Sequence, residues 1–230
     1  MSEQAFDFAA GEVLLINKPL TWSSFQVVKK LKYRIGKKIK IGHAGTLDPL
    51  ATGLLIICTG KKTKAIESYQ AQEKEYTGEI TLGLTTPSLD LETEFDGEFP
   101  TSHITSELIH ETTKQFIGEI DQFPPIFSAI KIGGERLYKK ARKGETAESA
   151  EIVSRKVTIT EFEITKIEMP KVSFRVVCSK GTYIRSLARD FGKALNSGGH
   201  LSALCRTRIG EFSLTDAHEL ETLAASLKKK

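Results

Sequence analysis

The stretch Gly42-His43-Ala44-Gly45-Thr46-Leu47-Asp48-Pro49-Leu50-Ala51-Thr52-Gly53-Leu54-Leu55 is the part of the sequence from which the rest can be interpreted. It combines three glycines, a proline, a histidine and one carboxylate, and it continues into the apolar run Leu54–Cys58. Glycine permits backbone conformations closed to other residues, and Pro49 fixes its own φ and favours an extended Asp48. The composition predicts a rigid loop that presents Asp48 and leads into a buried strand.

The charges around Asp48 are unusual. It is the only acidic residue between Lys18 and Lys64, a span with eleven lysines and arginines. Nearby positive charge favours the ionised form of a carboxyl group, which suits a nucleophile or an electrostatic stabiliser better than a proton donor. The alternative is that Asp48-Pro49 simply makes a turn.

The motif GHAGTLDPLATGLL resembles the catalytic motif of the tRNA pseudouridine-55 synthase family, in which the aspartate is the essential residue. The resemblance covers roughly residues 10 to 212. It implies an enzyme, an isomerase that converts uridine to pseudouridine in the T-arm loop of tRNA after the base is extruded. The reaction involves no net redox change and no gained group, so it implies no cofactor. Many members continue into a C-terminal PUA domain, for which this sequence ends too soon.

Length and composition limit the class of protein. The chain has 230 residues, 40% hydrophobic and 27% charged, which predicts one large domain, or one domain elaborated by insertions, with a substantial core. The resemblance implies that residues 1–230 form a single catalytic domain. The net charge of +4 is small, but the basic span Lys18–Lys64 precedes an acidic span, Glu67–Asp121. Such segregation is expected when one face meets a polyanion, although a merely solvated lysine-rich surface remains the alternative.

Several features indicate a cytoplasmic protein. Cys58, Cys178 and Cys205 are far apart and lack C-x-x-C spacing, so the sequence predicts neither a disulfide framework nor a zinc site. The N-terminus lacks a signal-peptide pattern, and no apolar run approaches the roughly 20 residues of a membrane span. We expect a monomer without metal or membrane association whose partner is tRNA.

Local patterns predict the elements around the motif. Glu12–Asn17 is typical of a buried strand, and Ser23 or Ser24 begins a helix that Gly36 ends. The segment Thr59–Lys64 is similar to the end of a P-loop, but the required glycine five residues before Gly60 is missing, which excludes a triphosphate site. No G-x-G-x-x-G follows a strand, so a Rossmann-bound cofactor has no support.

The middle of the chain carries a second candidate site residue and an insertion. Tyr76–Leu82 alternates as a half-buried strand, and the resemblance implies that Tyr76 stacks on the target base and takes part in proton transfer. Thr85–Thr101 is rich in acids and turn residues, which predicts an exposed connection. After a helix over Ser106–Phe116, the resemblance implies an insertion at about residues 122–150 that grips the T-arm with a glycine hinge and a basic helix.

The last third predicts two strands, Val157–Ile167 and Val172–Cys178, followed by a helix that starts near Gly181. Arg185 lies in the first turn of that helix, where a cation is unfavourable unless it has an anionic partner. The pattern Gly-Thr-Tyr-Ile-Arg-Ser-Leu resembles a second family hallmark, whose arginine pairs with the catalytic aspartate, so we expect Arg185 to hold Asp48. A surface salt bridge, for instance with Asp190, is the alternative.

A further family-like element, Gly198–Gly210, implies that Leu204 lines the uracil pocket, and a final helix is expected over Asp216–Leu227 before the basic tail Lys228–Lys230. The resemblance also suggests that His43 fills the space left by the extruded base. The complete set of residues expected to contact substrate or RNA is His43, Gly45, Thr46, Lys18, Lys64, Leu204, Lys131, Arg142 and Arg206.

The consecutive strands near residues 157–178 favour hairpins, and the resemblance implies a pseudouridine-synthase fold: α+β, with a mixed, mainly antiparallel sheet flanked by helices and an RNA-gripping insertion. Two other functions remain open. One is a non-catalytic RNA-binding protein, and the other is an unrelated carboxylate hydrolase, although Asp48 lacks a second acid beside it. The residues leave open a covalent ribosyl adduct or a glycal route, and Asp48 or Tyr76 as the base that removes the C5 proton.

Overall fold

The computed structural model describes residues 6–128, 130–145 and 152–227. The chain divides into two compact units, the first formed by Met1–Tyr76 with Leu204–Lys230 and the second by Thr77–Ala203. Strands β4 (Lys74–Leu82) and β12 (Gly199–Ile209) carry residues of both units. The single catalytic domain over residues 1–230 therefore stays a prediction, and each unit is described by itself.

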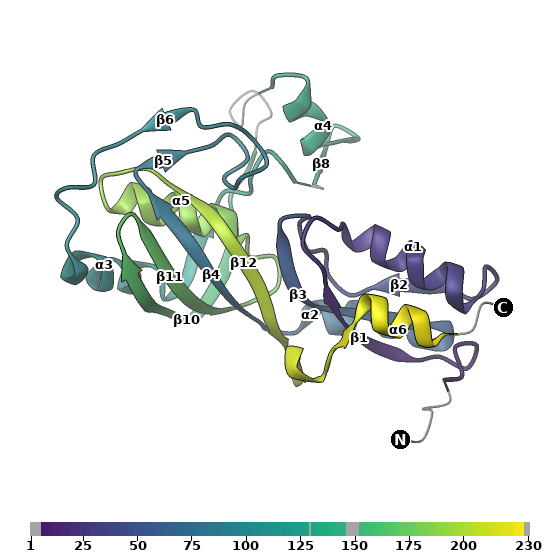
Figure 1. The fold of residues 1–230 in the computed structure, drawn as a ribbon. Helices are drawn as coiled ribbons and strands as arrows, with labels where there is room; N and C mark the ends of the chain where they lie inside the picture. The colour runs from purple at the N-terminus through teal and green to yellow at the C-terminus, as the bar shows by residue number, and fades with distance from the viewer. Residues whose placement is uncertain (1–5, 129, 146–151, 228–230) are drawn as a thin grey trace. The chain divides into compact units, whose positions relative to one another are not determined.

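The first unit is built around strand β3 (Ala51–Thr59), which follows the Asp48 loop (Figure 1). It pairs antiparallel with β1 (Val13–Lys18) and β2 (Ile41–His43), and parallel with the end of β12. Two short strands complete the sheet: β14 (His218–Glu219) lies parallel to β1, and β13 (Phe212–Ser213) forms a hairpin with β12. The expected buried strand after the loop is confirmed, and it begins three residues earlier, at Ala51.

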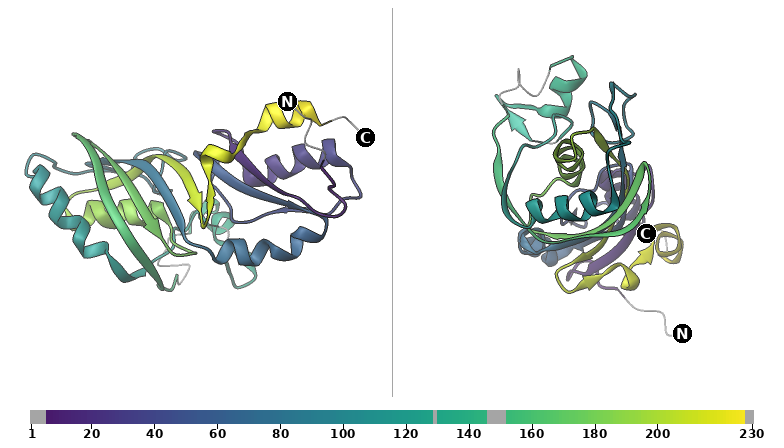
Figure 2. Two further views of the ribbon diagram at one scale, coloured as in Figure 1. Left: turned by 90° about the horizontal axis from the view of Figure 1, so that it is seen from below. Right: turned by 90° about the vertical axis from the view of Figure 1, so that its left-hand side faces the viewer.

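Alternate side chains of β3 enter two separate cores because neighbouring residues in a strand point to opposite faces. Leu55 and Ile57 pack with α1 (Ser24–Ile35) and α6 (Leu220–Ser226), whereas Leu54, Ile56 and Cys58 lie in a second cluster with residues of α2 (Ile66–Ala71). Figure 2 shows α1 and α6 on one side of these strands and α2 on the other. The nearly unbroken apolar run of β3 reflects this coverage on both faces.

The ends of the first-unit helices test the local predictions. Helix α1 begins after Ser23, which forms a capping box with Gln26, and ends at Gly36, as expected. Helix α6 is shorter than the expected Asp216–Leu227. The reason is that a 3-10 turn, η3 (Leu214–Asp216), and the pairing of β14 with β1 use the preceding residues.

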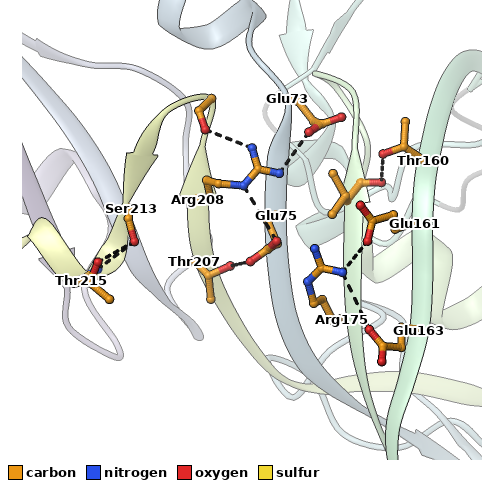
Figure 3. A network of polar contacts seen from close by, with 12 residues as sticks. Glu73, Glu75, Thr160, Glu161, Glu163, Arg175, Thr207, Arg208, Ser213 and Thr215 are labelled. Atoms are coloured by element: carbon orange, nitrogen blue, oxygen red, sulfur yellow. Dashed lines mark hydrogen bonds and ion pairs between the residues drawn. The ribbon is translucent and has the colours of Figure 1, made fainter.

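The second unit has strands in the order β12-β4-β11-β10-β7, in which β11 (Lys171–Cys178) and β7 (Gly118–Gln122) flank β10 (Arg155–Glu168) antiparallel. Helices α3 (Ser106–Thr113) and α5 (Ile184–Ala194) lie on one face of this sheet (Figure 2). Edge-to-face contacts of aromatic rings join the layers, with the Phe162 and Phe191 centroids 5.3 Å apart. The opposite face carries ion pairs such as Arg175 with Glu161 (Figure 3).

The remaining elements of the second unit are short. Strands β5 (Leu84–Thr85) and β6 (Gly97–Glu98) pair with each other, and a 3-10 turn, η2 (Lys114–Phe116), continues α3. In the insertion, β8 (Lys131–Ile132) and β9 (Glu135–Arg136) form a hairpin whose turn is the expected glycine hinge, and α4 (Leu137–Arg142) is the expected basic helix. Residues 146–150 of the insertion and the tail Lys228–Lys230 lie outside the described residues.

Candidate active site

The loop that presents Asp48 is held by hydrogen bonds on both sides of the carboxylate. The buried Ser24 hydroxyl accepts from the Leu47 N–H at 2.9 Å and donates to the Leu47 carbonyl at 3.2 Å. On the other side, the Thr21 N–H donates to the Pro49 carbonyl at 2.8 Å. Helix α1 and the residues before it therefore fix the backbone of the half-buried Asp48.

Lys18 lies beneath this loop rather than on the surface. Its side chain is completely buried, and its ammonium donates to three backbone carbonyls: Pro19 at 2.9 Å, Trp22 at 2.6 Å and Pro49 at 3.4 Å. An ammonium has three donors, so these bonds use all of them. In this structure the residue supports the Asp48 loop from below, and its expected RNA contact stays a prediction.

The electrostatics place Lys18 within reach of Asp48. Burial lowers the pKa of Lys18 to about 8, the negative charge of Asp48 opposes this shift, and the positive charge of Arg206 adds to it. A buried cation whose charge Asp48 stabilises also stabilises the ionised form of Asp48 in return. The ionised Asp48 carboxylate stays a prediction, which the positive charge of Lys18 favours.

Arg206 is the second buried cation of the site. It is 1% exposed, and its guanidinium donates from Nε to the Leu54 carbonyl at 2.8 Å and from Nη2 to the Gly45 carbonyl at 3.2 Å. Arg206 thus holds the backbone of the motif from inside, and its expected phosphate contact stays a prediction. The charge of arginine suggested exposure, and nothing in the local pattern showed that two carbonyls would hold it inside.

Glycine at position 53 permits the approach of Arg206 to the loop. Gly53 lies opposite Arg206 in the register of β3 and β12 and has a φ of 102°. A Cβ atom at this position would lie 2.3 Å from the Arg206 carbonyl oxygen, a distance that no side chain tolerates. Arg208, two residues further along β12, is partly exposed and pairs with Glu73 at 3.1 Å (Figure 3).

The other motif residues lie around the same loop. Burial and the charge of Arg206 lower the pKa of His43, so the imidazole is neutral at neutral pH. Gly45 has a φ of 97°, a conformation that favours glycine, and Thr46 is exposed. Lys64 is exposed on the 3-10 turn η1 (Gly60–Ala65) at the far end of β3.

Tyr76 and Leu204 come from the strands that carry residues of both units. Tyr76 lies in β4 and is 9% exposed, so most of its side chain is packed in the core and a small part reaches the surface. Leu204 lies in β12 opposite Ala51, only three residues from Asp48 in the sequence, and is half-buried. Leu204 and Asp48 therefore belong to the same unit, as a pocket role requires.

Arg185 belongs to the second unit, at the start of α5. It is 4% exposed and donates to the carbonyls of Ser88 at 3.0 Å and Phe127 at 2.9 Å, and its Nε lies 3.5 Å from Asp90 Oδ2. Asp190, the alternative partner considered for Arg185, pairs with Arg189 at 2.8 Å. Asp48 lies in the first unit, so its pairing with Arg185 stays a prediction.

The connection expected to be exposed over Thr85–Thr101 is mostly exposed from Leu91 onward, but its first part is buried against Arg185. Thr86, Ser88 and Asp90 are buried at 2%, 0% and 5% exposure. The Thr86 hydroxyl donates to the Asp90 carbonyl at 2.6 Å, and the Asp90 carboxylate accepts the Glu92 N–H at 3.0 Å. Asp90 is a neighbour of Arg185 that the sequence analysis did not identify, because the contact joins residues 95 positions apart in the sequence.

The insertion presents its cations at the surface. Lys131 and Arg142 are exposed, and Arg142 lies over the Tyr138 ring at 5.6 Å and pairs with Glu92 at 3.4 Å. Within the described ranges, no group of three or more His, Cys, Asp or Glu side chains could hold a metal ion. No helix in that part of the chain is long and apolar enough to cross a membrane.

Comparisons with known proteins identify the family of the chain. Residues 30–184 match the family model described as TruB family pseudouridylate synthase (N terminal domain), and residues 185–230 match the tRNA pseudouridylate synthase B C-terminal domain. Two similar proteins are the tRNA pseudouridine synthase B of Flavobacterium johnsoniae, 64% identical over 96% of this chain and 98% of its own, and that of Phocaeicola vulgatus, 54% identical over 94% and 93%.

A crystal structure of a Cbf5-Nop10-Gar1 complex contains a similar chain, with a TM-score of 0.72 and 30% identity over 95% of this chain. The present chain spans 54% of that longer chain. The expected pseudouridine-synthase fold, α+β with a mixed, mainly antiparallel sheet, is thereby confirmed. On the strength of both family models and these relatives, the chain belongs to the TruB family of pseudouridylate synthases.

Proposed function

We propose that this protein isomerises uridine to pseudouridine at position 55, in the T-arm loop of tRNA, with Asp48 as the nucleophile and without a cofactor. The observation that carries the proposal is the loop of Asp48, whose neighbours Leu47 and Pro49 are both pinned by hydrogen bonds above the buried cation Lys18. The relatives named tRNA pseudouridine synthase B support the class of substrate.

The reaction requires a carboxylate that is ionised and already oriented. After the uridine is extruded, Asp48 attacks C1′ or stabilises the sugar while the N1–C1′ bond breaks, in the manner of a glycosidase carboxylate. The released uracil turns and forms the C5–C1′ bond, and the proton at C5 then leaves while N1 gains one. Lys18 and Arg206 keep positive charge next to the Asp48 loop during the whole reaction. Leu204 forms an apolar wall for the base.

The roles of Tyr76 and Arg185 are proposed from the resemblance to the family and from the positions of these residues in the fold. Tyr76 stacks on the base and is one of two candidates, with Asp48, for removal of the C5 proton. Arg185 holds the Asp48 carboxylate, and Asp90 in turn orients the Arg185 guanidinium from 3.5 Å. Because Arg185 is buried among carbonyls, its orientation is fixed before substrate arrives.

The RNA backbone is bound by exposed cations, for which Lys64, Lys131 and Arg142 are our candidates, and by Thr46 and His43 next to the extruded nucleotide. Such contacts weaken with increasing salt because bound counterions are released. We expect the protein to act in the cytoplasm as a monomer.

The decisive experiment compares wild type with Asp48→Asn on a T-arm stem-loop that carries tritium at C5 of the target uridine. Wild type releases tritium, whereas the variant binds the RNA and releases none. Asp216→Asn, which changes an exposed carboxylate in the same unit, serves as the matched control and releases tritium normally. Equal release by Asp48→Asn and wild type would refute the role of Asp48, and no release by wild type on any tRNA would favour an RNA-binding protein.

A further inference from the structure

The side chain of Gln122, at the end of β7, holds the main chain of Tyr183. The Tyr183 N–H donates to Gln122 Oε1 at 2.8 Å, and Gln122 Nε2 donates to the Tyr183 carbonyl at 3.1 Å. Gln122 is only 1% exposed, so water does not compete for these bonds. A side-chain amide carries an acceptor and a donor side by side, and here it repeats the two-bond pattern that joins opposite residues of antiparallel strands. The pair connects positions 61 residues apart.

Tyr183 is the residue that precedes the first turn of α5. Its φ of −98° and ψ of 109° are extended, and its side chain makes no capping hydrogen bond to the helix. Helices usually begin with Ser, Thr, Asp or Asn, whose short side chains cap the first turn. A tyrosine side chain does not supply such a cap. Gln122 therefore fixes, from β7, the residue at which α5 starts.

Arg185 follows Tyr183 by two residues, so its backbone depends on the same anchor. Its guanidinium donates to two backbone carbonyls, which fix the far end of the side chain. The chain after Gln122 also follows the helix, because the Ser186 hydroxyl donates to the Phe123 carbonyl at 2.8 Å. All of these contacts lie in the second unit. Gln122 thus holds the backbone end of Arg185, and carbonyls hold the guanidinium end.

We propose that Gln122 is a positioning residue for the isomerisation of uridine. By fixing Tyr183 it sets the place from which Arg185 extends, and with it the geometry in which Arg185 holds the Asp48 carboxylate. A guanidinium holds a carboxylate through directed hydrogen bonds, so a displaced helix start changes the orientation of the carboxylate. This inference rests on the proposed function and deepens it by one residue that acts through α5 and not on the substrate.

Two substitutions test this role. Gln122→Met removes both hydrogen bonds and keeps a long unbranched side chain. Gln122→Asn keeps the amide but is one methylene group shorter, so both bonds form only if the start of α5 moves; it also serves if Gln122→Met does not fold. In both variants we expect single-turnover tritium release at saturating tRNA to fall about 10- to 100-fold, because a displacement of about 1 Å has an effect of this size on catalysis. Affinity for tRNA stays at the wild-type value, which separates positioning from RNA binding.

The matched control acts on the other end of the same helix. His103→Phe/Ser197→Ala also removes two side-chain hydrogen bonds, from His103 Nε2 to the Leu195 carbonyl at 2.9 Å and from Ser197 Oγ to the Pro100 carbonyl at 3.0 Å. We expect the control to lower the urea midpoint and to release tritium at the wild-type rate. An equal loss of rate in the control, or a wild-type rate in both Gln122 variants, would overturn the proposal. A loss of tRNA affinity in place of a loss of rate would overturn it as well.

An NMR measurement separates this proposal from the proposed function. The Nε–H signal of Arg185, identified by its disappearance in Arg185→Lys, reports the position of the guanidinium without any turnover. We expect this signal to shift in both Gln122 variants and to stay unchanged in the control. A wild-type protein that releases no tritium, together with a shifted signal in the variants, would refute the proposed function alone. An active wild type whose signal and rate are unaffected by both substitutions would refute only the role of Gln122.

Discussion

Replacing Arg206 by methionine tests whether this arginine supports the Asp48 loop or binds RNA. The guanidinium donates to the carbonyls of Leu54 and Gly45 from a side chain that is 1% exposed. Methionine is flexible and replaces the aliphatic stem of the arginine, but it has no guanidinium and donates no hydrogen bond. The substitution therefore leaves two carbonyls without this partner and releases the loop at Gly45.

The expected loss follows from these two bonds. Hydrogen bonds to a charged group contribute about 1.5–3 kcal/mol each. The variant no longer buries a charge, which offsets part of that contribution. We expect the free energy of unfolding to fall by about 3 kcal/mol, which corresponds to a shift of about 1 M in the urea midpoint if the urea dependence is about 3 kcal/mol per M.

Urea denaturation followed by circular dichroism measures this loss, and titration of the His43 ring by NMR gives an independent readout. The charge of Arg206 lowers the pKa of His43, so that pKa rises in the variant. Arg208→Met is the matched control, because Arg208 is partly exposed and each of its ion pairs, with Glu73 and Glu75, is expected to contribute less than about 1 kcal/mol. Unchanged stability of Arg206→Met, together with weaker tRNA binding and a smaller salt slope, would show that Arg206 contacts phosphate after all.

Two further predictions concern Lys18 and Asp90. The pKa of Lys18 is about 8 in the folded protein, compared with 10.5 for a lysine in the unfolded chain. Between these values the unfolded chain holds a proton that the folded protein has lost, so the unfolding free energy rises with pH by about 3 kcal/mol. We expect no such rise in Lys18→Met. Urea titrations of both proteins from pH 7 to 10.5 measure the difference. The same pH dependence in both proteins would contradict the lowered pKa of Lys18. Asp90→Asn removes the charge 3.5 Å from Arg185, and we expect tritium release to fall at least about tenfold, a cost of about 1.4 kcal/mol, with tRNA binding retained. Asp96→Asn, which changes an exposed acid in the same segment, is its control, and a similar loss in both variants would remove the special role of Asp90.

Much of the secondary structure followed from local patterns. Ser23 and Gly36 marked the ends of α1, and the alternation in Val172–Cys178 marked β11, because caps and strand periodicity depend only on neighbouring residues. The final helix was predicted too long because a distant strand, β1, pairs with the residues before α6. Local sequence propensity cannot predict pairing with a strand that is distant in the sequence.

The sequence also predicted the surroundings of some charged residues but not of others. The sequence identified Asp48 as a lone acid among cations and identified Arg185 as a cation that needs a partner. It placed Lys18 and Arg206 at the RNA surface, whereas the structure buries both beneath the Asp48 loop. Their burial depends on backbone carbonyls that no sequence pattern assigns to them, such as the Leu54 carbonyl, 152 residues from Arg206.

By itself the sequence determined a glycine-rich loop that presents one carboxylate among many cations, because glycine, proline and local charge act over a few residues. Only the tertiary structure decided which cations support that loop from inside and which remain free for RNA. The physical reason is that a lysine or arginine is buried when folding brings carbonyl partners to it, as at Arg206, and stays exposed when folding brings only other cations, as at Lys38 and Lys61.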